Sequence, residues 1–276
     1  MKTQHFIYII IAFIILAACE EPIDIPLRQA DQRLVIEGLI TDSEGPHDVQ
    51  LTWLNQFGDT AAAEPAVDAV VTITDAEAGF TETLVMNEPG LYQTNQIIGK
   101  EGNTYTLSVS INGEEYGATS KLPPVGRLDS VLYRYVDDLT AVPEAGYYLR
   151  FYAQDDGSSK DFYLTQLLQN DTLYTDGALP YLIFDDRFAQ GAYIPGFLVP
   201  FPLDSGNVAK LAFYTMTEEA YDYYFAIVQQ NGSGSPFGAP PANLPTNLSN
   251  GALGFFRASG YRYLEGKLNG YEGVFK

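Results

Sequence analysis

The sequence predicts a mainly β fold: an amino-terminal immunoglobulin-like antiparallel sandwich at residues 33–122, then a second β-rich domain at 126–276 with one helix near 217–231. Three observations support this prediction. Apolar and polar residues alternate with a period of two, as they do in half-buried strands. Turn sequences rich in glycine, proline, asparagine and aspartate separate the alternating segments. The clearest helical spacing is confined to one segment near the carboxyl end.

Residues 1–18 resemble the signal peptide of a bacterial lipoprotein. Lys2 gives a positive start, and an unbroken apolar run follows at 6–15. Small residues then precede Cys19, which is the single cysteine of the chain. The apolar run is shorter than the roughly 20 residues that span a bilayer. We therefore expect cleavage before Cys19 and lipidation of its thiol with diacylglycerol and fatty acids such as palmitate; the alternative is an ordinary secretory signal followed by a chance cysteine.

Residues 19–32 are predicted to be a tether between the lipid and the folded chain. Two prolines and several charges oppose a helix there. Glu20 and Glu21, directly behind Cys19, resemble the signal that exports Bacteroidota lipoproteins to the cell surface. The alternative is a solvated linker that carries no export signal. We therefore expect a lipid-anchored protein of the outer membrane that faces the cell exterior.

The region 33–122 contains the most regular alternation. Strands are expected at 34–40, 49–54, 69–74, 83–86, 91–94 and 105–111. Asn112-Gly113, between Ile111 and Glu114, is the sequence typical of a type I′ hairpin turn. Short strands separated by regular turns predict an immunoglobulin-like sandwich, here without the cysteine pair of antibody domains.

Leu122-Pro123-Pro124-Val125 is a stiff break, and we place the domain boundary there. Further strands are expected at 130–136, 147–153, 161–168, 253–259 and 261–264. The stretch 171–207 is dotted with proline and glycine and holds short strand pieces such as 181–184. A structureless loop of that length is unusual unless it serves a function.

The predicted helix begins near Thr217, with Glu218 and Glu219 in its first turn. Its expected apolar face consists of Ala220, Tyr221, Tyr224, Phe225 and Val228. The helix is expected to end before Gly232.

The composition excludes several function classes. The chain has 35 acidic and 15 basic residues, a net charge of −20, which opposes binding to nucleic acid or to anionic headgroups. Membrane attachment must therefore come from the lipid anchor. His5 leaves with the signal, so the mature chain keeps one histidine and cannot form a histidine cluster for zinc. Its single cysteine, Cys19, is the expected lipidation site, so no cysteine is left to act as a nucleophile. A Ser-His-Asp relay would need His47, which we expect to be a surface residue at a turn.

Acidic residues offer two further interpretations. The doublets Asp137-Asp138, Asp155-Asp156 and Asp185-Asp186 contain the carboxylate pairs that glycoside hydrolysis uses, although solvated turns are the simpler interpretation. Asp155 to Asp161 places oxygen ligands at alternating positions, as a weak calcium candidate, but Lys160 would repel the ion and we favour a hairpin turn. We predict no catalytic residue, no cofactor and no metal.

Two kinds of surface site are predicted. Thr60, Ser130 and Thr172 stand in tripeptides that resemble the O-glycosylation sequence of exported Bacteroidota proteins; polar loops or strand ends are the alternative. The aromatic and proline-rich segments 193–202 and 236–245 are candidate contact surfaces, because proline limits the entropy lost on binding. Their expected contact residues are Tyr193, Phe197, Phe201, Phe237, Pro240 and Pro241. The alternative is that these residues fill the protein's own core.

The carboxyl-terminal half resembles a known family. The tyrosine-rich segment 219–224 is followed by Pro236-Phe237, by 240–248 and by 249–256, and Leu34 to Gly38 stands in the expected place behind the lipidation motif. This order resembles the lipoproteins of domain-of-unknown-function family 4249 of Bacteroidota. The resemblance implies an outer-membrane lipoprotein, often encoded beside a TonB-dependent transporter, with an immunoglobulin-like first domain. It implies no established catalytic residues.

We therefore expect a surface-exposed, non-enzymatic lipoprotein that partners a TonB-dependent outer-membrane transporter, either capturing its ligand or forming a lid. A structural or adhesive surface protein is the first alternative. A glycan hydrolase with paired carboxylates is the second.

Overall fold

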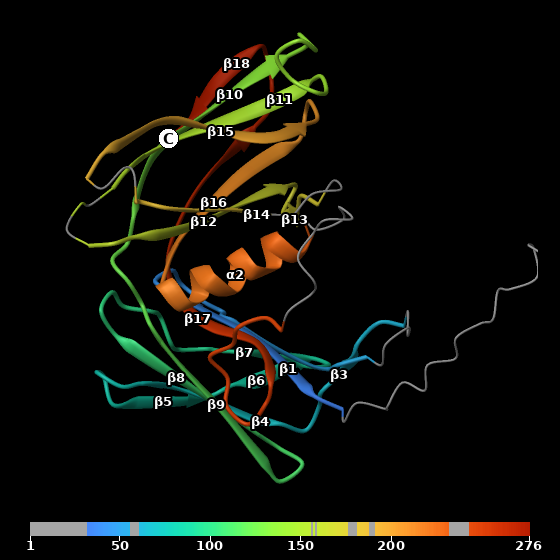
Figure 1. Cartoon of the computed structure of the whole chain (residues 1–276), viewed down its shortest axis with the longest axis vertical. Helices are drawn as coiled ribbons and strands as arrows, with labels where there is room; N and C mark the ends of the chain where they lie inside the picture. The colour runs from blue at the N-terminus through green and yellow to red at the C-terminus, as the bar shows by residue number, and fades with distance from the viewer. Residues whose placement is uncertain are drawn as a thin grey trace, which may run out of the picture. The chain divides into compact units, whose positions relative to one another are not determined.

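Eighteen β-strands and one α-helix make up the part of the chain that the structure, a computed structural model, describes (Figure 1). That part comprises residues 32–55, 61–155, 157, 159–175, 181–187, 191–231 and 243–276. The predicted sites Cys19, Thr60, Phe237, Pro240 and Pro241 lie outside it. The prediction of a mainly β fold is confirmed.

The first part of the described chain is a sandwich of two antiparallel sheets. One has the order β1 (Leu34–Thr41), β2 (Asp48–Trp53), β7 (Leu91–Gln93) and β6 (Val85–Glu88), with β3 (Glu64–Pro65) beside β2. The other has the order β5 (Phe80–Thr83), β4 (Val70–Asp75), β8 (Thr104–Ile111) and β9 (Glu114–Lys121). If the two-residue β3 is left out, the strands β1, β2 and β4 to β9 correspond in chain order to strands A, B, C, C′, D, E, F and G of an immunoglobulin domain. The sheets are then ABED and C′CFG, which is an immunoglobulin-like arrangement.

The alternation of side chains explains this sandwich. In β8, Tyr105, Leu107, Val109 and Ile111 are buried, whereas the threonines and serines between them face outward. The buried residues of both sheets form one hydrophobic cluster. Asn112 and Gly113 have φ values of 54° and 81°, so the turn between β8 and β9 has the positive φ angles that a type I′ turn requires.

The second part contains a four-stranded sheet, which we call the carboxyl-terminal sheet. Its order is β15 (Tyr193–Leu203), β11 (Gly146–Gln154), β10 (Arg127–Val136) and β18 (Glu272–Phe275). It packs against a sheet in which β12 (Phe162–Gln169), β16 (Val208–Met216) and β17 (Leu253–Lys267) are neighbours, with β13 (Thr172–Leu173) and β14 (Tyr181–Asp185) beside β12. Aromatic rings fill the space between the sheets; Phe151 and Tyr163 lie 5.9 and 5.2 Å from Phe213. In its described residues, the stretch 171–207 therefore contains the strands β13, β14 and β15 rather than one loop.

The strand β17 joins the two parts. Its first half pairs in parallel with β1, from Val35↔Leu253 to Thr41↔Ser259, and its second half pairs antiparallel with β16. A ten-stranded sheet consequently runs through both parts, and contacts group Gln32–Lys276 as one unit. The buried clusters do divide near the predicted boundary, because Leu122 belongs to the first and Val131 to the second. The predicted division into domains stays a prediction.

The helix α2 (Glu218–Asn231) lies over the outer face of β12 and β14 and beside β17 (Figure 1). Thr217 caps it, since Thr217 Oγ1 accepts a hydrogen bond from Ala220 N at 3.3 Å. The predicted face was partly wrong: Tyr223 is buried against Phe255, whereas Phe225 is exposed. No helix in the described part of the chain is long and apolar enough to cross a membrane.

His47 is buried, which corrects the expectation of a surface histidine. Its backbone N–H donates to Thr94 Oγ1 at 2.9 Å, and its Nε2 has no hydrogen-bond partner among the described residues, so a catalytic relay through Nε2 is not formed. Burial lowers the pKa of His47, while the nearby charges of Asp48 and Glu82 partly oppose this shift.

We expect this shift of the His47 pKa to make the stability of the protein depend on pH. As pH falls through the ordinary histidine pKa of about 6.5, the unfolded chain binds a proton that folded His47 resists, so stability is lost below that pH. The free energy of unfolding should fall faster from pH 7.5 to 5 in the wild type than in His47→Gln, by at most about 1.4 kcal/mol per pH unit. Identical profiles in urea titrations would contradict a buried neutral histidine.

Candidate functional site

A groove lies on the outer face of the carboxyl-terminal sheet, away from its core. In β10 the buried residues Val131 and Tyr133 alternate with the exposed residues Leu132 and Arg134, so the outer face carries a separate set of side chains. The groove has a volume of about 810 Å³, within the range of small-molecule sites. Its floor consists of strands, which hold side chains more rigidly than loops do.

The strand register arranges the floor in two rows. The first row crosses all four strands and contains Val274, Leu132, Arg150 and Leu198. The second row contains Glu272, Arg134 and Tyr148. Because Arg134 and Arg150 occupy adjacent rows on neighbouring strands, their Cβ atoms are separated by roughly 7–8 Å. Their guanidinium groups point apart, because Arg150 donates to Gly196 on β15 and Arg134 donates to Tyr271, which precedes β18.

The wall of the groove is the turn that follows β10. Asp138 Oδ1 accepts hydrogen bonds from Thr140 N at 2.9 Å and Thr140 Oγ1 at 2.6 Å. Tyr148 Oη donates to Glu144 O at 2.8 Å and ties the end of this turn to β11. The acids Asp137 and Asp138 stand on this wall.

The two arginines are held by neutral partners. Arg134 Nε and Nη2 donate to Tyr271 Oη at 3.2 and 2.7 Å, and these bonds hold the pKa of Arg134 above its ordinary value. Arg150 Nη1 donates to Gly196 O at 3.2 Å. Within the described residues, neither guanidinium lies within 4 Å of a carboxylate oxygen, although Glu272 is opposite Arg134 in the strand register and its charge acts on that arginine.

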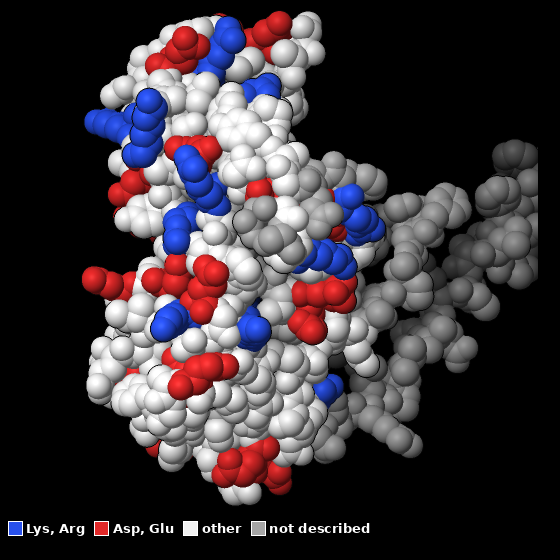
Figure 2. Space-filling view, turned by 90° about the vertical axis from the view of Figure 1, so that its left-hand side faces the viewer, with Lys and Arg blue, Asp and Glu red and all other residues white. Residues whose placement is uncertain are grey.

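The distribution of charge differs between the two parts of the chain. Residues 33–122 contain 14 acidic and three basic side chains. Figure 2 shows basic side chains gathered in the upper half of its face, where Figure 1 places the carboxyl-terminal sheet, whereas the lower half carries mainly acidic groups. The two arginines of the groove belong to this less acidic part of the protein, and the lining of the groove also contains Asp137, Asp138 and Glu272.

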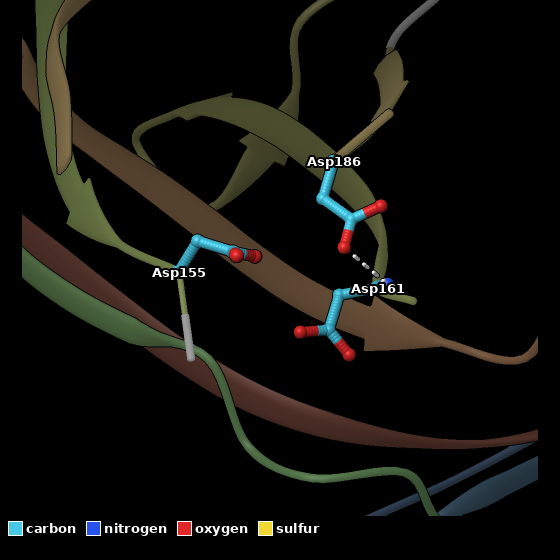
Figure 3. Close-up of side chains that lie close together, drawn as sticks. All are labelled: Asp155, Asp161 and Asp186. Atoms are coloured by element: carbon cyan, nitrogen blue, oxygen red, sulfur yellow. Dashed lines mark hydrogen bonds between the residues drawn. The ribbon is translucent and has the colours of Figure 1, made fainter. Parts of the chain in front are cut away.

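A second cluster contains three buried carboxylates, Asp155, Asp161 and Asp186, which are 2, 8 and 4% exposed. They come from the ends of β11, β12 and β14, and each offers an oxygen within 4.8 Å of the others (Figure 3). The dashed line in Figure 3 marks the hydrogen bond that Asp161 N donates to Asp186 Oδ2 at 3.0 Å.

Asp155 holds three donors in place. Its Oδ1 accepts from Tyr163 Oη at 2.6 Å, and its Oδ2 accepts from Gly157 N at 3.1 Å and Gly191 N at 2.5 Å. Burial, the hydrogen bond to Asp155 and the surrounding carboxylates raise the pKa of Tyr163 well above its ordinary value, so the hydroxyl keeps its proton. The cluster thus ties strand ends together.

Three carboxylate oxygens are the donors that Ca²⁺ uses, but both oxygens of Asp155 already face N–H or O–H donors, which compete with a cation. The sequence pattern did indicate that Asp155 and Asp161 lie close together, and the structure adds Asp186 from another doublet. Calcium binding at Asp155 and Asp161 stays the weak candidate that the sequence offered, and the expectation of no metal stays a prediction. Asp155 and Asp186 are also buried rather than exposed across an open cleft, which gives the hydrolase interpretation no support.

A family model described as a domain of unknown function, DUF4249, matches residues 20–263. The chain belongs to the DUF4249 family. The match extends from the tether into β17, so the family resemblance seen in the sequence is confirmed over both parts of the fold. No curated protein matches the chain.

The other predicted sites of this DUF4249 protein lie at different places. Tyr193 and Phe197 are exposed on β15, and Phe201 is half-buried, 6.0 Å from the ring of Tyr174. Phe197 also stacks on Phe184 at 5.5 Å, so it partly serves the core. The glycosylation candidates are a half-buried Ser130 on β10 and an exposed Thr172 on β13. Glycosylation and the contact role of these residues stay predictions.

Sequence reasoning missed the two arginines of the groove. The segment 193–202 was singled out for its aromatic residues, yet its contribution to the groove is Leu198. The signal that was available is the alternation in β10 and β11, where Arg134 and Arg150 occupy outward positions next to buried residues. Alternation places them on one face, but only the strand register shows that they are neighbours.

Proposed function

We propose that this DUF4249 protein is a non-enzymatic, lipid-anchored protein of the bacterial outer membrane that captures a ligand for a TonB-dependent transporter. The observation that supports this proposal is the groove, which combines a ligand-sized volume, cationic donors and apolar side chains on a rigid sheet. A lid over the transporter is the second form of the same role. The rigid floor of the groove favours capture, because a lid requires only a covering surface.

The predicted anchor fits this role. A fully extended tether of residues 19–32 would reach roughly 50 Å, so the folded part can lie well beyond the lipid headgroups. Confinement to the membrane raises the effective concentration of protein and transporter for each other, so a modest interface suffices. The acidic surface makes direct adsorption to anionic headgroups unfavourable and leaves attachment to the acyl chains.

The proposal is tested by native co-purification. The tagged full-length protein is extracted from its own outer membrane with mild detergent, with and without prior cross-linking. We expect a TonB-dependent barrel to co-purify, and we expect deletion of the protein to reduce uptake of the cargo of that barrel. A monomer in every extraction, together with unchanged uptake, would refute the transporter association.

The anchor gives a separate prediction. Cys19→Ser is expected to abolish acylation, because the acyl chain needs the thiol, and the protein should move from the membrane to the soluble fraction. Mass spectrometry of the amino terminus and membrane fractionation measure this change.

Replacing both Glu20 and Glu21 by Gln is the matched control for the Cys19→Ser experiment. It should leave the protein lipidated and membrane-bound but reduce its accessibility to protease added to intact cells. Persistent membrane association of Cys19→Ser would contradict the lipid anchor.

A further inference from the structure

We propose that the groove of the carboxyl-terminal sheet binds an uncharged small molecule, whose apolar body lies over Leu132, Leu198 and Val274 and whose neutral oxygen acceptor lies beside Arg150. This inference deepens the capture role and rests on it for its biological meaning. Binding itself is a property of the folded chain and is measured without a transporter.

Apolar side chains occupy the middle of the floor. The outward positions of an antiparallel sheet with one solvated face are usually polar. The first row nevertheless holds Leu132, Leu198 and Val274, which are 36, 38 and 44% exposed. The wall adds Ala141 and Val142 to the lining. An apolar ligand body seated on this row would remove apolar surface of both partners from water, which favours binding.

The charged groups of the lining oppose a net charge of either sign on the ligand. The lining contains two guanidinium groups and three carboxylates, those of Asp137, Asp138 and Glu272. Glu272 is opposite Arg134 in the strand register, and Asp138 accepts two hydrogen bonds from Thr140. An anion would be repelled by the carboxylates and a cation by the arginines. A ligand without net charge avoids both repulsions, so the mixed lining selects for it.

Arg150 supplies a hydrogen-bond donor for a neutral group. It stands between Leu132 on β10 and Leu198 on β15 in the first row. The one hydrogen bond that Arg150 donates within the described residues goes to Gly196 O, and a guanidinium carries five N–H donors. The remaining N–H groups can donate to a carbonyl, ester or hydroxyl oxygen of the ligand. An apolar floor with a few polar groups that fix orientation is typical of small-molecule sites.

The test uses three fluorescent probes that share one apolar body: the neutral 1-pyrenebutanamide, the anion 1-pyrenebutanoate and the cation 4-(1-pyrenyl)butylamine. The purified full-length protein is titrated with each probe at about 150 mM NaCl, which screens the general attraction of the amine to an acidic surface. We expect the amide to bind about tenfold more tightly than either ion, because only the amide avoids like charges in the groove.

Variants assign the site. Leu132→Gln and Leu198→Gln should each weaken binding of the amide about fivefold, because each replaces an apolar contact by a polar one. Val208→Gln is the matched control, because Val208 is an apolar residue of β16 that is 40% exposed and lies outside the groove. Arg150→Gln should leave amide binding within about twofold, since glutamine keeps an N–H donor. Circular dichroism checks that each variant is folded.

The proposal is overturned if either ion binds as tightly as the amide, if the leucine variants bind like the wild type, or if Val208→Gln weakens binding as much as they do. A tenfold loss in Arg150→Gln would also overturn it, because the charge of the arginine would then hold the ligand. Failure of these titrations with a barrel still co-purifying would remove this ligand class and keep the transporter association. Amide binding without any barrel partner would do the opposite.

Discussion

Gly254→Ala is expected to destabilise the protein by about 3 kcal/mol or more, and to lower its Tm by roughly 6–12 °C. Gly254 has a φ of 93°, and a Cβ added there would lie 2.2 Å from the carbonyl oxygen of Ile36. That oxygen belongs to β1, which pairs with β17 at this point through Ile36↔Gly254. The backbone of β1 cannot move away without breaking the pairing that joins the two parts of the fold.

The matched control for this substitution is Gly251→Ala. Gly251 also has a positive φ, of 72°, but a Cβ added there meets no atom within 4 Å. Gly251→Ala should therefore lower the free energy of unfolding only by the backbone strain of about 1–2 kcal/mol. Urea and thermal unfolding of both variants measure the difference. Equal losses would show that the close approach of β17 to β1 is unimportant for stability.

The segment before Gly254 is hydrogen-bonded to β17 where that strand pairs with β1. Thr246 Oγ1 donates to Gly254 O at 2.8 Å, and the Asn247 side chain bonds both Phe256 O at 2.7 Å and Phe256 N at 3.1 Å. Ser249 N donates to Gly117 O at 2.8 Å, which covers part of the edge strand β9. The described part of the sequence signature at 236–256 is thus the segment that joins the two parts.

The sequence predicted those elements whose stabilising contacts are local. The turn at Asn112-Gly113 is specified by two residues, and the start of α2 is specified by Thr217 and the glutamates behind it. The pairing of β1 with β17 joins residues more than 200 positions apart. Parallel strands are not connected by a short turn, so no turn sequence indicates that they pair. No local pattern could have placed Leu253 beside Val35.

The same distinction applies to the candidate site. The short spacing of Asp155 and Asp161 made their proximity predictable, whereas Asp186 joins them only through the pairing of β12 with β14. The groove requires four strands from distant places in the chain. Burial of His47 and of Tyr223 was also unpredictable, because each depends on what packs over it rather than on its neighbours in sequence.

Asp155→Ala is expected to cost about 3 kcal/mol, the second large effect. The substitution removes the acceptor of the buried Tyr163 hydroxyl and of the partly buried N–H groups of Gly157 and Gly191, so the hydroxyl in particular loses its partner away from solvent. Tyr163→Phe removes one donor and leaves Asp155 with its two backbone N–H partners, so it should cost about 1 kcal/mol. Urea unfolding in the presence of EDTA measures both.

Asp155→Asn separates the role of hydrogen bonding from that of charge. An amide oxygen can accept from Gly157 and Gly191, and its NH₂ can donate to the Tyr163 oxygen, so the contacts are retained. The substitution also removes one of three carboxylates whose oxygens lie within 4.8 Å of one another. Because like charges in a buried site repel strongly, Asp155→Asn should be at least as stable as the wild type at pH 7. If Asp155→Asn were as unstable as Asp155→Ala in EDTA, the negative charge itself would be required, and mutual repulsion could not be the dominant electrostatic term in this cluster.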